Sequence, residues 1–507
     1  MDAREAYDEL VQRSKEIFTI GSTNALVGWD QRVNMPPSGI KHRAEMTTYL
    51  QELLHRKQAD PRLGELLETA EQGNWAAEPA ANLREWRRDY DPASRLPPAL
   101  VRRRGELTAR ANIVWQEARA NNRFTAFAPY LGDLIALSRD IADHLGWLGE
   151  RYDALLDLYE PGLTTADVEA LFADLRSHLV PLFRQILGSP VKGDGTLLRN
   201  AEFPIAGQQA LGVAISGALG FDYAAGRLDV STHPFTTSFG RQDVRLTTRY
   251  DLTWPFQSLM GTIHEAGHGI YDQGVPEAHE GTPLGETVSL GIHESQSRFF
   301  ENNIGRSHAF WRYWYPRFQL EFPGLVEHIS FDEFYCLVND VCPSLIRVEA
   351  DEVTYNLHIM ARFEIERDLF RDSIRPADVP AVWNEKYLRY LGITPATDRE
   401  GVLQDVHWSW GYFGYFPTYS LGTVYAAQLE AALRRDVPDL DRQMASGDFS
   451  QPLNWMREHV HCHGKLYLPK ELIERATGKP PNTHDYIRYL THKYSEIYKL
   501  SVDDNKP

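Results

Sequence analysis

The sequence predicts a mainly α-helical protein with one small β-sheet. Apolar residues recur at helical spacing through most of the 507 residues, and only the region between about residues 220 and 250 shows short alternating runs. No stretch resembles a long disordered linker, so we expect one large folded unit over residues 1–507. The loop-like stretch 188–195 divides it into a mostly helical N-terminal lobe, 1–195, and a second portion, 196–507.

Composition places the chain among soluble globular proteins. Hydrophobic residues make up 43% and charged residues 24% of the chain, and the net charge of -17 argues against nucleic-acid and anionic-membrane partners. The three cysteines, Cys336, Cys342 and Cys462, do not form a disulfide framework, which suits a reducing compartment. The polar N-terminus lacks the apolar core of a signal peptide, and no stretch has the apolar length of a membrane span. We therefore expect a cytoplasmic protein.

The helices follow from the spacing of apolar residues. Residues 3–30 form a first amphipathic segment that stops before Pro36 and Pro37. Long charged segments between about 39 and 187 repeat the same period and predict antiparallel helices, such as those over 100–121 and 127–152. The helical pattern returns beyond residue 300 and continues to the C-terminus, in segments that include 310–320, 331–341 and 344–370.

The predicted strands lie at 227–230, 235–239 and 243–249, where Thr, Val and Phe alternate with polar residues. A small sheet at this place offers an edge strand that an extended peptide can join. A stabilising hairpin without substrate contact explains the pattern equally well.

The segment after these strands carries the sequence His264-Glu265-Ala-Gly-His268. On a helix, residues four apart lie on one face, so the two imidazoles can bind one metal ion. Glu265 points sideways from them, where a general base for an activated water has to stand. Chance would supply this pattern in such a chain less than about one time in ten. The alternative makes both histidines buried structural side chains and Glu265 a surface charge.

A third ligand comes from the next helical segment, 286–300, which contains His293-Glu294-Ser-Gln296. Catalytic zinc takes three protein ligands and keeps a fourth position open, and two histidines with one glutamate are a known set. We predict Glu294 as the third ligand beside His264 and His268.

Arg347 lies in the segment 344–358, which places several charges inside a partly apolar predicted helix. Burying these charges is costly unless each is paired or faces a cleft. Arg347 can clamp a carboxylate with two hydrogen bonds. The alternatives are an internal salt bridge to Glu349 or Asp351, or a solvated face.

A stretch rich in Gly and Tyr, 401–419, contains His407, Tyr415 and Tyr419. Side chains of these types can donate hydrogen bonds to the oxyanion of a tetrahedral intermediate. Aromatic packing is the structural alternative for all three.

Six motifs occur together in one order along the chain. They are His233-Pro-Phe235, Asp243-x-Arg245-x-Thr247, His264-Glu265-x-x-His268, His293-Glu294-Ser-Gln296, Ile346-Arg347-x-x-Ala350-Asp351 and Gly401-x-x-Gln404-Asp405-x-His407-Trp408. This set resembles the signature of the M32 metallocarboxypeptidases of the thermostable carboxypeptidase Taq type. The resemblance extends over nearly the whole chain, because the start, Trp29-Asp30 through Pro36-Pro37, is also similar.

The resemblance implies a large, two-lobed helical fold with a deep active-site groove like that of neurolysin-type peptidases, and a small sheet at the groove wall. It also implies a homodimer, zinc with cobalt as a possible substitute, and broad removal of C-terminal residues from peptides, usually with proline excluded at the cut position. By position, His264, His268 and Glu294 match the metal ligands and Glu265 the base, and Arg347 falls in the substrate-clamp motif.

A carboxypeptidase has to recognise a free carboxylate, and Arg347 and Arg245 are the candidate cations; we also assign His233 and Asp243 to substrate binding. The acid that orients His264 or His268 is not identifiable from the sequence. Two rival functions remain: an endo-acting oligopeptidase of the same zinc class, and a non-catalytic helical binding protein.

Overall fold

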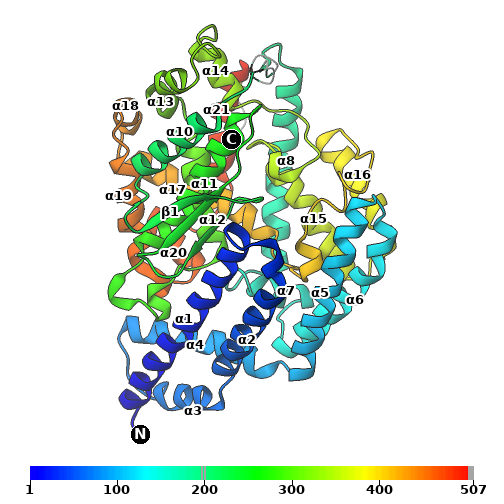
Figure 1. Ribbon diagram of the computed structural model, residues 1–507, viewed down its shortest axis with the longest axis vertical. Helices are drawn as coiled ribbons and strands as arrows, with labels where there is room; N and C mark the ends of the chain where they lie inside the picture. Colours follow the sequence, from blue (N-terminus) through cyan, green and yellow to red (C-terminus); the bar gives the residue numbers. More distant parts are fainter. Residues whose placement is uncertain (194, 196–197, 199–200, 501–507) are drawn as a thin grey trace.

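The computed structural model describes all residues except 194, 196–197, 199–200 and 501–507, and it is mainly helical with a small sheet (Figure 1). The predicted lobe boundary lies between 195 and 196, and residue 196 is outside this description, so the division into lobes stays a prediction. Within the described residues, no helix is both long enough and apolar enough to cross a membrane.

The N-terminal helices follow the predicted periodicity. The first, α1, begins after Asp2, whose side chain accepts a hydrogen bond from the Glu5 backbone N–H in a capping box. The helices up to residue 188 are α1 (Ala3–Val33), α2 (Ile40–Gln58), α3 (Pro61–Ala70), α4 (Ala77–Arg95), α5 (Pro98–Ala120), α6 (Phe124–Leu145), α7 (Arg151–Asp157) and α8 (Thr165–Gly188).

The prediction of one helix over 127–152 is wrong, because this stretch forms most of α6, a turn and the start of α7. The break lies at Gly146, which caps α6 with a φ of 84°. Glycine reaches this region of φ without the steric cost that a side chain brings. The two helices therefore pack as separate elements.

The predicted strand region is confirmed. After α10 (Ile205–Leu219) the chain forms β1 (Gly226–Val230), β2 (Thr236–Ser238) and β3 (Val244–Thr248). The order in the sheet is β1-β3-β2, with β1 parallel and β2 antiparallel to the central β3. The strand β2 is thus an edge strand, and it lies next to the helix that follows the sheet.

The second half of the chain is helical again. Its helices are α11 (Pro255–Gly274), α12 (Leu290–Arg298), α13 (His308–Glu321), α14 (Phe331–Val338), α15 (Tyr355–Phe370), α16 (Val379–Leu391), α17 (Pro417–Asp436), α18 (Leu440–Ala445), α19 (Ser450–His459), α20 (Pro469–Thr477) and α21 (His484–Tyr498). A π-helical turn, η4 (Phe299–Ile304), continues α12 directly.

The prediction of a helix over 344–370 is correct only from Tyr355 onward. The part before it is a 3₁₀ turn, η5 (Arg347–Glu349), and an irregular segment. Asp351 competes with helix formation there, because its carboxylate accepts hydrogen bonds from the backbone N–H groups of Val353 and Thr354 at 2.9 and 3.0 Å. Arg347 consequently lies outside any regular helix.

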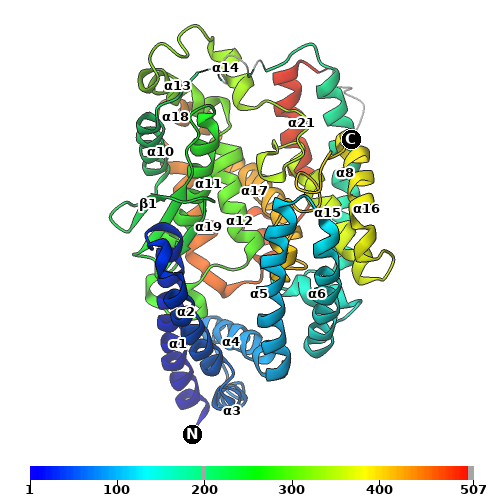
Figure 2. The ribbon, with the colours of Figure 1, turned by 45° about the vertical axis from the view of Figure 1, so that its right-hand side comes forward.

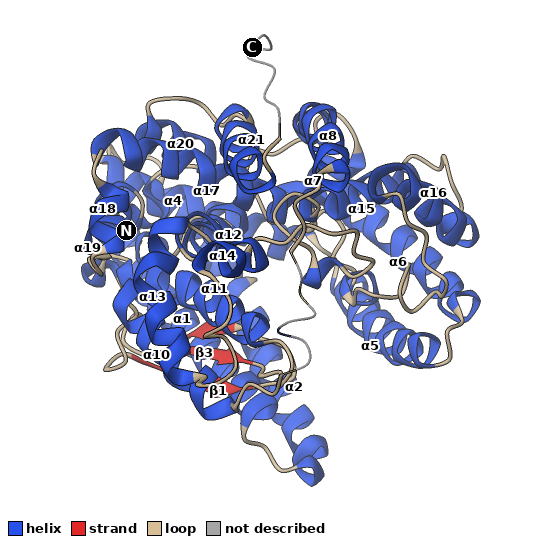
Figure 3. Ribbon diagram, turned by 90° about the horizontal axis from the view of Figure 1, so that it is seen from above, coloured by secondary structure: helices blue, strands red, loops and turns tan. Residues whose placement is uncertain are grey.

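Two apolar cores hold these elements. A small one joins α1, α3 and α4 through residues such as Leu10, Leu66 and Trp86, and a large one extends from Ala111 to Tyr498. Seen from above, α10, α13 and the sheet lie on one side and α5, α6 and α16 on the other (Figure 3). The turned view also separates α1 and α2 from α15 and α16, with α12 and α17 between them (Figure 2).

Candidate metal centre

The helices α11 and α12 bring three predicted ligands to one place. Nε2 of His264 lies 3.6 Å and Nε2 of His268 lies 3.4 Å from Oε2 of Glu294. One ligand atom from each of the three side chains lies within 4.8 Å of the others. The side chains are 19%, 15% and 7% exposed, respectively, so solvent still reaches the histidines.

These distances fit a metal ion of zinc size. A tetrahedral site with metal–ligand bonds of about 2.0–2.2 Å separates neighbouring ligand atoms by about 3.3–3.6 Å. Two imidazole nitrogens and one carboxylate oxygen are also a donor set that zinc accepts in catalytic sites. The residues present therefore fit the metal that the sequence pattern implies.

The close approach of the two helices depends on Gly267. A Cβ atom at this position would lie 2.6 Å from the carbonyl oxygen of Gln296 and 2.7 Å from Cα of Ser297. Real Cβ atoms do not come this close to backbone, so any side chain at 267 would push α12 away from α11. The absence of a side chain thus lets Glu294 reach the two histidines.

Glu265 is fixed by the edge strand of the sheet. Oγ1 of Thr236, on β2, donates to Oε2 of Glu265 at 2.7 Å and to its backbone carbonyl oxygen at 2.9 Å. The residue is 7% exposed, and burial raises the pKa of its carboxyl group above the ordinary value. A raised pKa makes the carboxylate a better proton acceptor near neutral pH.

The acid that the sequence did not identify is Glu301, on η4. Its Oε2 lies 2.9 Å from Nδ1 of His264, the ring nitrogen on the other side from the metal position. Such a carboxylate holds the imidazole ring and its tautomer in place. Although burial acts to raise it, Arg298 and His264 lower the pKa of Glu301 to about 2, so this group is ionised at neutral pH.

Arg298 connects Glu294, the third predicted ligand, with Glu301. Its Nε donates to Oε1 of Glu294 at 2.7 Å and its Nη1 to Oε2 of Glu301 at 3.2 Å. Burial alone would raise the pKa of Glu294, but Arg298 and His264 hold it well below its usual range. Glu294 is therefore available as an ionised ligand.

The side chains of His407, Tyr415 and Tyr419 form one aromatic cluster. Nε2 of His407 lies 3.2 Å from the hydroxyl oxygen of Tyr419, and the ring of Tyr415 lies 5.3 Å from both other rings. Tyr419 belongs to α17, which passes close to the predicted ligand Glu294: a Cβ atom at Gly422 would lie 2.7 Å from Cβ of Glu294. Burial lowers the pKa of His407 to about 3, so its ring is neutral at pH 7.

A buried carboxylate holds the loop that carries His407. Glu366, on α15, accepts hydrogen bonds from Nε1 of Trp408 at 2.7 Å, the backbone N–H of Gly414 at 2.9 Å and the Tyr152 hydroxyl at 2.6 Å. These bonds attach both sides of the segment between Trp408 and Gly414 to α15. The position of His407 thus depends on Glu366.

Arg347 pairs with Asp405, which was not among the partners predicted from the sequence. Its Nε and Nη2 donate to Oδ1 of Asp405 at 3.0 and 2.8 Å, and its Nη1 donates to the Tyr355 hydroxyl at 3.2 Å. Glu349 and Asp351, predicted as possible partners, do not pair with it. The second carboxylate oxygen of Asp405 lies 2.6 Å from Nη2 of Arg362, whose side chain is fully buried.

Asp243 and Arg245 bind each other. Nε and Nη2 of Arg245 donate to the two carboxylate oxygens of Asp243 at 2.8 and 2.9 Å, and the guanidinium lies over the ring of Trp29 at 4.2 Å. His233 is exposed on the loop between β1 and β2. Their predicted role in substrate binding stays a prediction.

Sequence reasoning missed Glu301, Arg298 and Thr236. Glu301 follows Glu294 by about two helical turns, a spacing that returns to the same helix face and that could have pointed to it. Thr236 comes from another element, and the sequence carries no local signal for its contact with Glu265.

Comparison with known proteins agrees with this geometry. A family model described as "Carboxypeptidase Taq (M32) metallopeptidase" matches residues 9–494. Thermostable carboxypeptidase 1 of Thermus thermophilus is 42% identical over 511 residues, covering 98% of this chain and 100% of that protein. Carboxypeptidase 1 of Bacillus subtilis is 41% identical over 488 residues, covering 96% of this chain and 97% of that protein.

Solved structures are also similar to this chain in both fold and sequence. The crystal structure of the M32 carboxypeptidase from Deinococcus radiodurans R1 superimposes with a TM-score of 0.94 at 37% identity and covers 98% of this chain and 100% of that one. The structure of metallocarboxypeptidase 1 of Trypanosoma cruzi has a TM-score of 0.91 at 39% identity, and the match covers 97% of this chain and 99% of that one. The family match over nearly the full chain, together with this likeness in fold, shows that the protein is a metallocarboxypeptidase that belongs to the M32 family.

Proposed function

We propose that the protein is a zinc-dependent carboxypeptidase that removes C-terminal residues from peptides with broad specificity. The observation that carries the proposal is the convergence of His264, His268 and Glu294, with Glu265 beside them. A divalent ion held by these ligands supplies Lewis-acid activation of water and of the scissile carbonyl group. Zinc is the metal we expect, with cobalt as a possible substitute.

Glu265 acts as the general base in this proposal. Its Oε1 is left to accept the proton of the attacking water while Thr236 binds Oε2, so the carboxylate is held in one orientation. The same oxygen then delivers the proton to the departing amine, because acid and base roles alternate in the two halves of the reaction. No covalent bond between enzyme and substrate is needed.

The donors for the oxyanion come from the cluster of His407, Tyr415 and Tyr419. Burial raises the pKa of Tyr415 to about 12, so its hydroxyl group keeps its proton and can donate it in a hydrogen bond. A neutral His407 likewise carries one N–H. Donors fixed in a low-dielectric site stabilise developing negative charge more strongly than water does.

Arg347 is our candidate for recognising the terminal carboxylate. Its side chain is 7% exposed and paired with Asp405, which fixes the guanidinium in place. Each terminal nitrogen carries a second N–H beyond the bonds to Asp405 and Tyr355, and these can bind a substrate carboxylate. His233, Asp243 and Arg245 are assigned to the same substrate-binding role.

We also propose that the enzyme is a cytoplasmic homodimer with a deep groove over the metal centre. Within the described residues, the cysteines at 336, 342 and 462 form no disulfide, as is usual for proteins of reducing compartments. The homodimer and the groove rest on the family's pattern alone.

The proposal is tested by mass spectrometry of a mixed peptide pool after incubation with zinc-loaded enzyme. A ladder of products shortened from the C-terminus is expected, and Glu265→Gln enzyme serves as the inactive control. Internal cuts would favour an endo-acting oligopeptidase. An unchanged pool, together with absent metal after metal-replete expression, would favour a non-catalytic binding protein.

A further inference from the structure

We propose that Arg104 and Tyr159 form an anion subsite that binds a carboxylate group of the peptide substrate. The inference rests on the proposed function, because it assigns the subsite to the same peptide that the metal centre cleaves. Nothing in the sequence motifs points to either residue.

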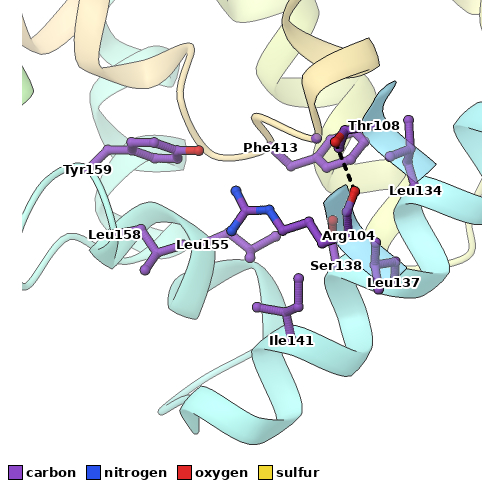
Figure 4. Close-up of a pocket in the computed structure, with 11 residues that line it drawn as sticks. Arg104, Thr108, Leu134, Leu137, Ser138, Ile141, Leu155, Leu158, Tyr159 and Phe413 are labelled. Atoms are coloured by element: carbon purple, nitrogen blue, oxygen red, sulfur yellow. Dashed lines mark hydrogen bonds between the residues drawn. The ribbon is translucent and has the colours of Figure 1, made fainter. Parts of the chain in front are cut away.

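The two residues line a small pocket between α5, α6 and the loop before α17 (Figure 4). The aliphatic part of Arg104 extends from α5 past Phe413, and its guanidinium group ends close to the Tyr159 ring. Leu155 and Ile141 complete the apolar wall. The pocket therefore combines one cation and one hydroxyl group with apolar surroundings.

The charge of Arg104 is not neutralised by the protein. Among the described residues its guanidinium group makes no ion pair and no hydrogen bond, although it is partly buried. The adjacent Arg103 pairs with Asp140 at 3.2 Å, so carboxylates are within reach of this helix. An unpaired cation in a partly buried, apolar setting is costly, and a bound anion removes that cost.

Tyr159 connects the pocket with the active-site cluster. Its ring packs edge-on against Tyr415 at 5.1 Å, and Tyr415 in turn packs against His407 at 5.3 Å. The backbone carbonyl of Tyr159 also accepts a hydrogen bond from Leu290 at 3.3 Å, at the start of the helix that carries Glu294. Tyr159, which lines the pocket, is thus in direct contact with Tyr415, one of the residues proposed to bind the oxyanion.

The chemistry of the pocket favours a carboxylate. Its free volume of about 20 Å³ is little more than the ~10–15 Å³ that one water needs, so it has room for one oxygen of an anion and not for a large side chain. A guanidinium group binds a carboxylate through two parallel N–H donors. Burial raises the pKa of Tyr159, so the hydroxyl group stays protonated and can donate a further hydrogen bond.

Two parts of a peptide carry such a group: the terminal carboxylate and the side chains of Asp and Glu. Both present the same planar anion to Arg104. A set of four peptides separates them, with one sequence made as free acid or as C-terminal amide, and with Glu or Gln at one internal position.

Binding is measured by calorimetry on the zinc-loaded, full-length Glu265→Gln protein, so that the peptides are not consumed. In this background, Arg104→Gln is expected to weaken binding about tenfold, as for the loss of a charge-assisted hydrogen-bonded pair. If the ligand is the chain end, the loss appears only with free acids. If it is a side chain, the loss appears only with Glu-containing peptides.

Matched variants decide whether the effect is local. Arg102→Gln removes the same charge from an exposed position on α5 and should leave all four affinities unchanged. Tyr159→Phe keeps the ring and should weaken binding of the same peptides by a smaller factor. Arg104→Lys should retain part of the affinity, because it keeps the charge and loses the two-pronged geometry.

The proposal is overturned if Arg104→Gln changes no affinity, lowers all four equally, or is reproduced by Arg102→Gln. Turnover of the peptides by the Glu265→Gln background would instead contradict the role of Glu265. The same four-peptide comparison would then be read from kcat/KM of the native enzyme, so the subsite is tested separately from the base.

Discussion

Arg298 donates a hydrogen bond from Nε to Oε1 of Glu294 at 2.7 Å, while the second oxygen of Glu294 lies 3.4 and 3.6 Å from the two histidines. One oxygen of the ligand is thus held by the protein and the other is presented to the metal position. This arrangement orients the carboxylate before any metal binds.

Arg298→Gln should lower zinc affinity about 10- to 100-fold, the usual cost of losing a group that orients a metal ligand. Competition with a chelator of known affinity measures the change. Arg317→Gln is a matched control, because Arg317 forms the same type of pair with Glu321 on the exposed side of α13, with the Arg317 side chain 53% exposed. Equal zinc affinity in both variants would show that Arg298 does not orient Glu294.

Glu265→Gln should keep its zinc and lose most of its activity. The amide preserves the shape of the side chain and cannot take a proton, and general-base catalysis contributes about 10²- to 10⁴-fold. Metal content and turnover are measured on the same preparation. A variant that retains more than about a tenth of wild-type turnover would contradict the assignment of the base.

Arg347→Ala should weaken kcat/KM for free-acid peptides by about 2–5 kcal/mol and change metal content little. The C-terminal amide of the same peptide should lose much less, because it has no carboxylate for Arg347 to bind. Asp405→Asn is the control, since it removes the negative charge that pairs with Arg347, keeps one oxygen as an acceptor and leaves the guanidinium present. If kcat/KM falls by the same factor for both peptides in the Arg347→Ala variant, the residue is structural and acts through Asp405.

Glu366 should make stability depend on pH. Burial raises the pKa of its carboxyl group from 4.5 to about 7. Between these values the native state binds more protons than the unfolded chain, so this contribution is full below pH ~4.5 and is lost as pH rises to about 7. The free energy of unfolding should fall by up to about 3 kcal/mol over this interval.

The check on Glu366 is the Glu366→Gln variant, which cannot titrate. Thermal unfolding midpoints of both proteins are compared from pH 5 to pH 8. We expect the wild type to lose stability relative to the variant as pH rises. Parallel curves would mean that Glu366 is already ionised in the native state throughout this range.

The convergence of the three predicted ligands could be predicted in part because helix geometry relates nearby positions. His264 and His268 are one turn apart, so their convergence follows from local structure alone. Glu294 required a second helix, and the sequence predicted that helix without its exact limits: α12 spans Leu290–Arg298 and continues as a π-helix.

Contacts between distant segments could not be predicted. Arg347 pairs with Asp405, 58 residues away, and a local pattern favours neighbours such as Glu349 instead. The irregular segment before Tyr355 was predicted as helix for a related reason. Its apolar spacing suits a helix, but the carboxylate of Asp351 accepts hydrogen bonds from the backbone N–H groups that follow it, and this prevents helix formation there.

The backbone contact at Gly267 has a consequence for evolution and for engineering. Because α11 and α12 touch there without an intervening side chain, the interval between the histidine pair and the carboxylate is set by main chain against main chain. Exchanging ligand residues changes how far each side chain reaches but leaves this backbone separation as it is. The ionic radius that the centre accepts is therefore set in part at a position that is not itself a predicted ligand.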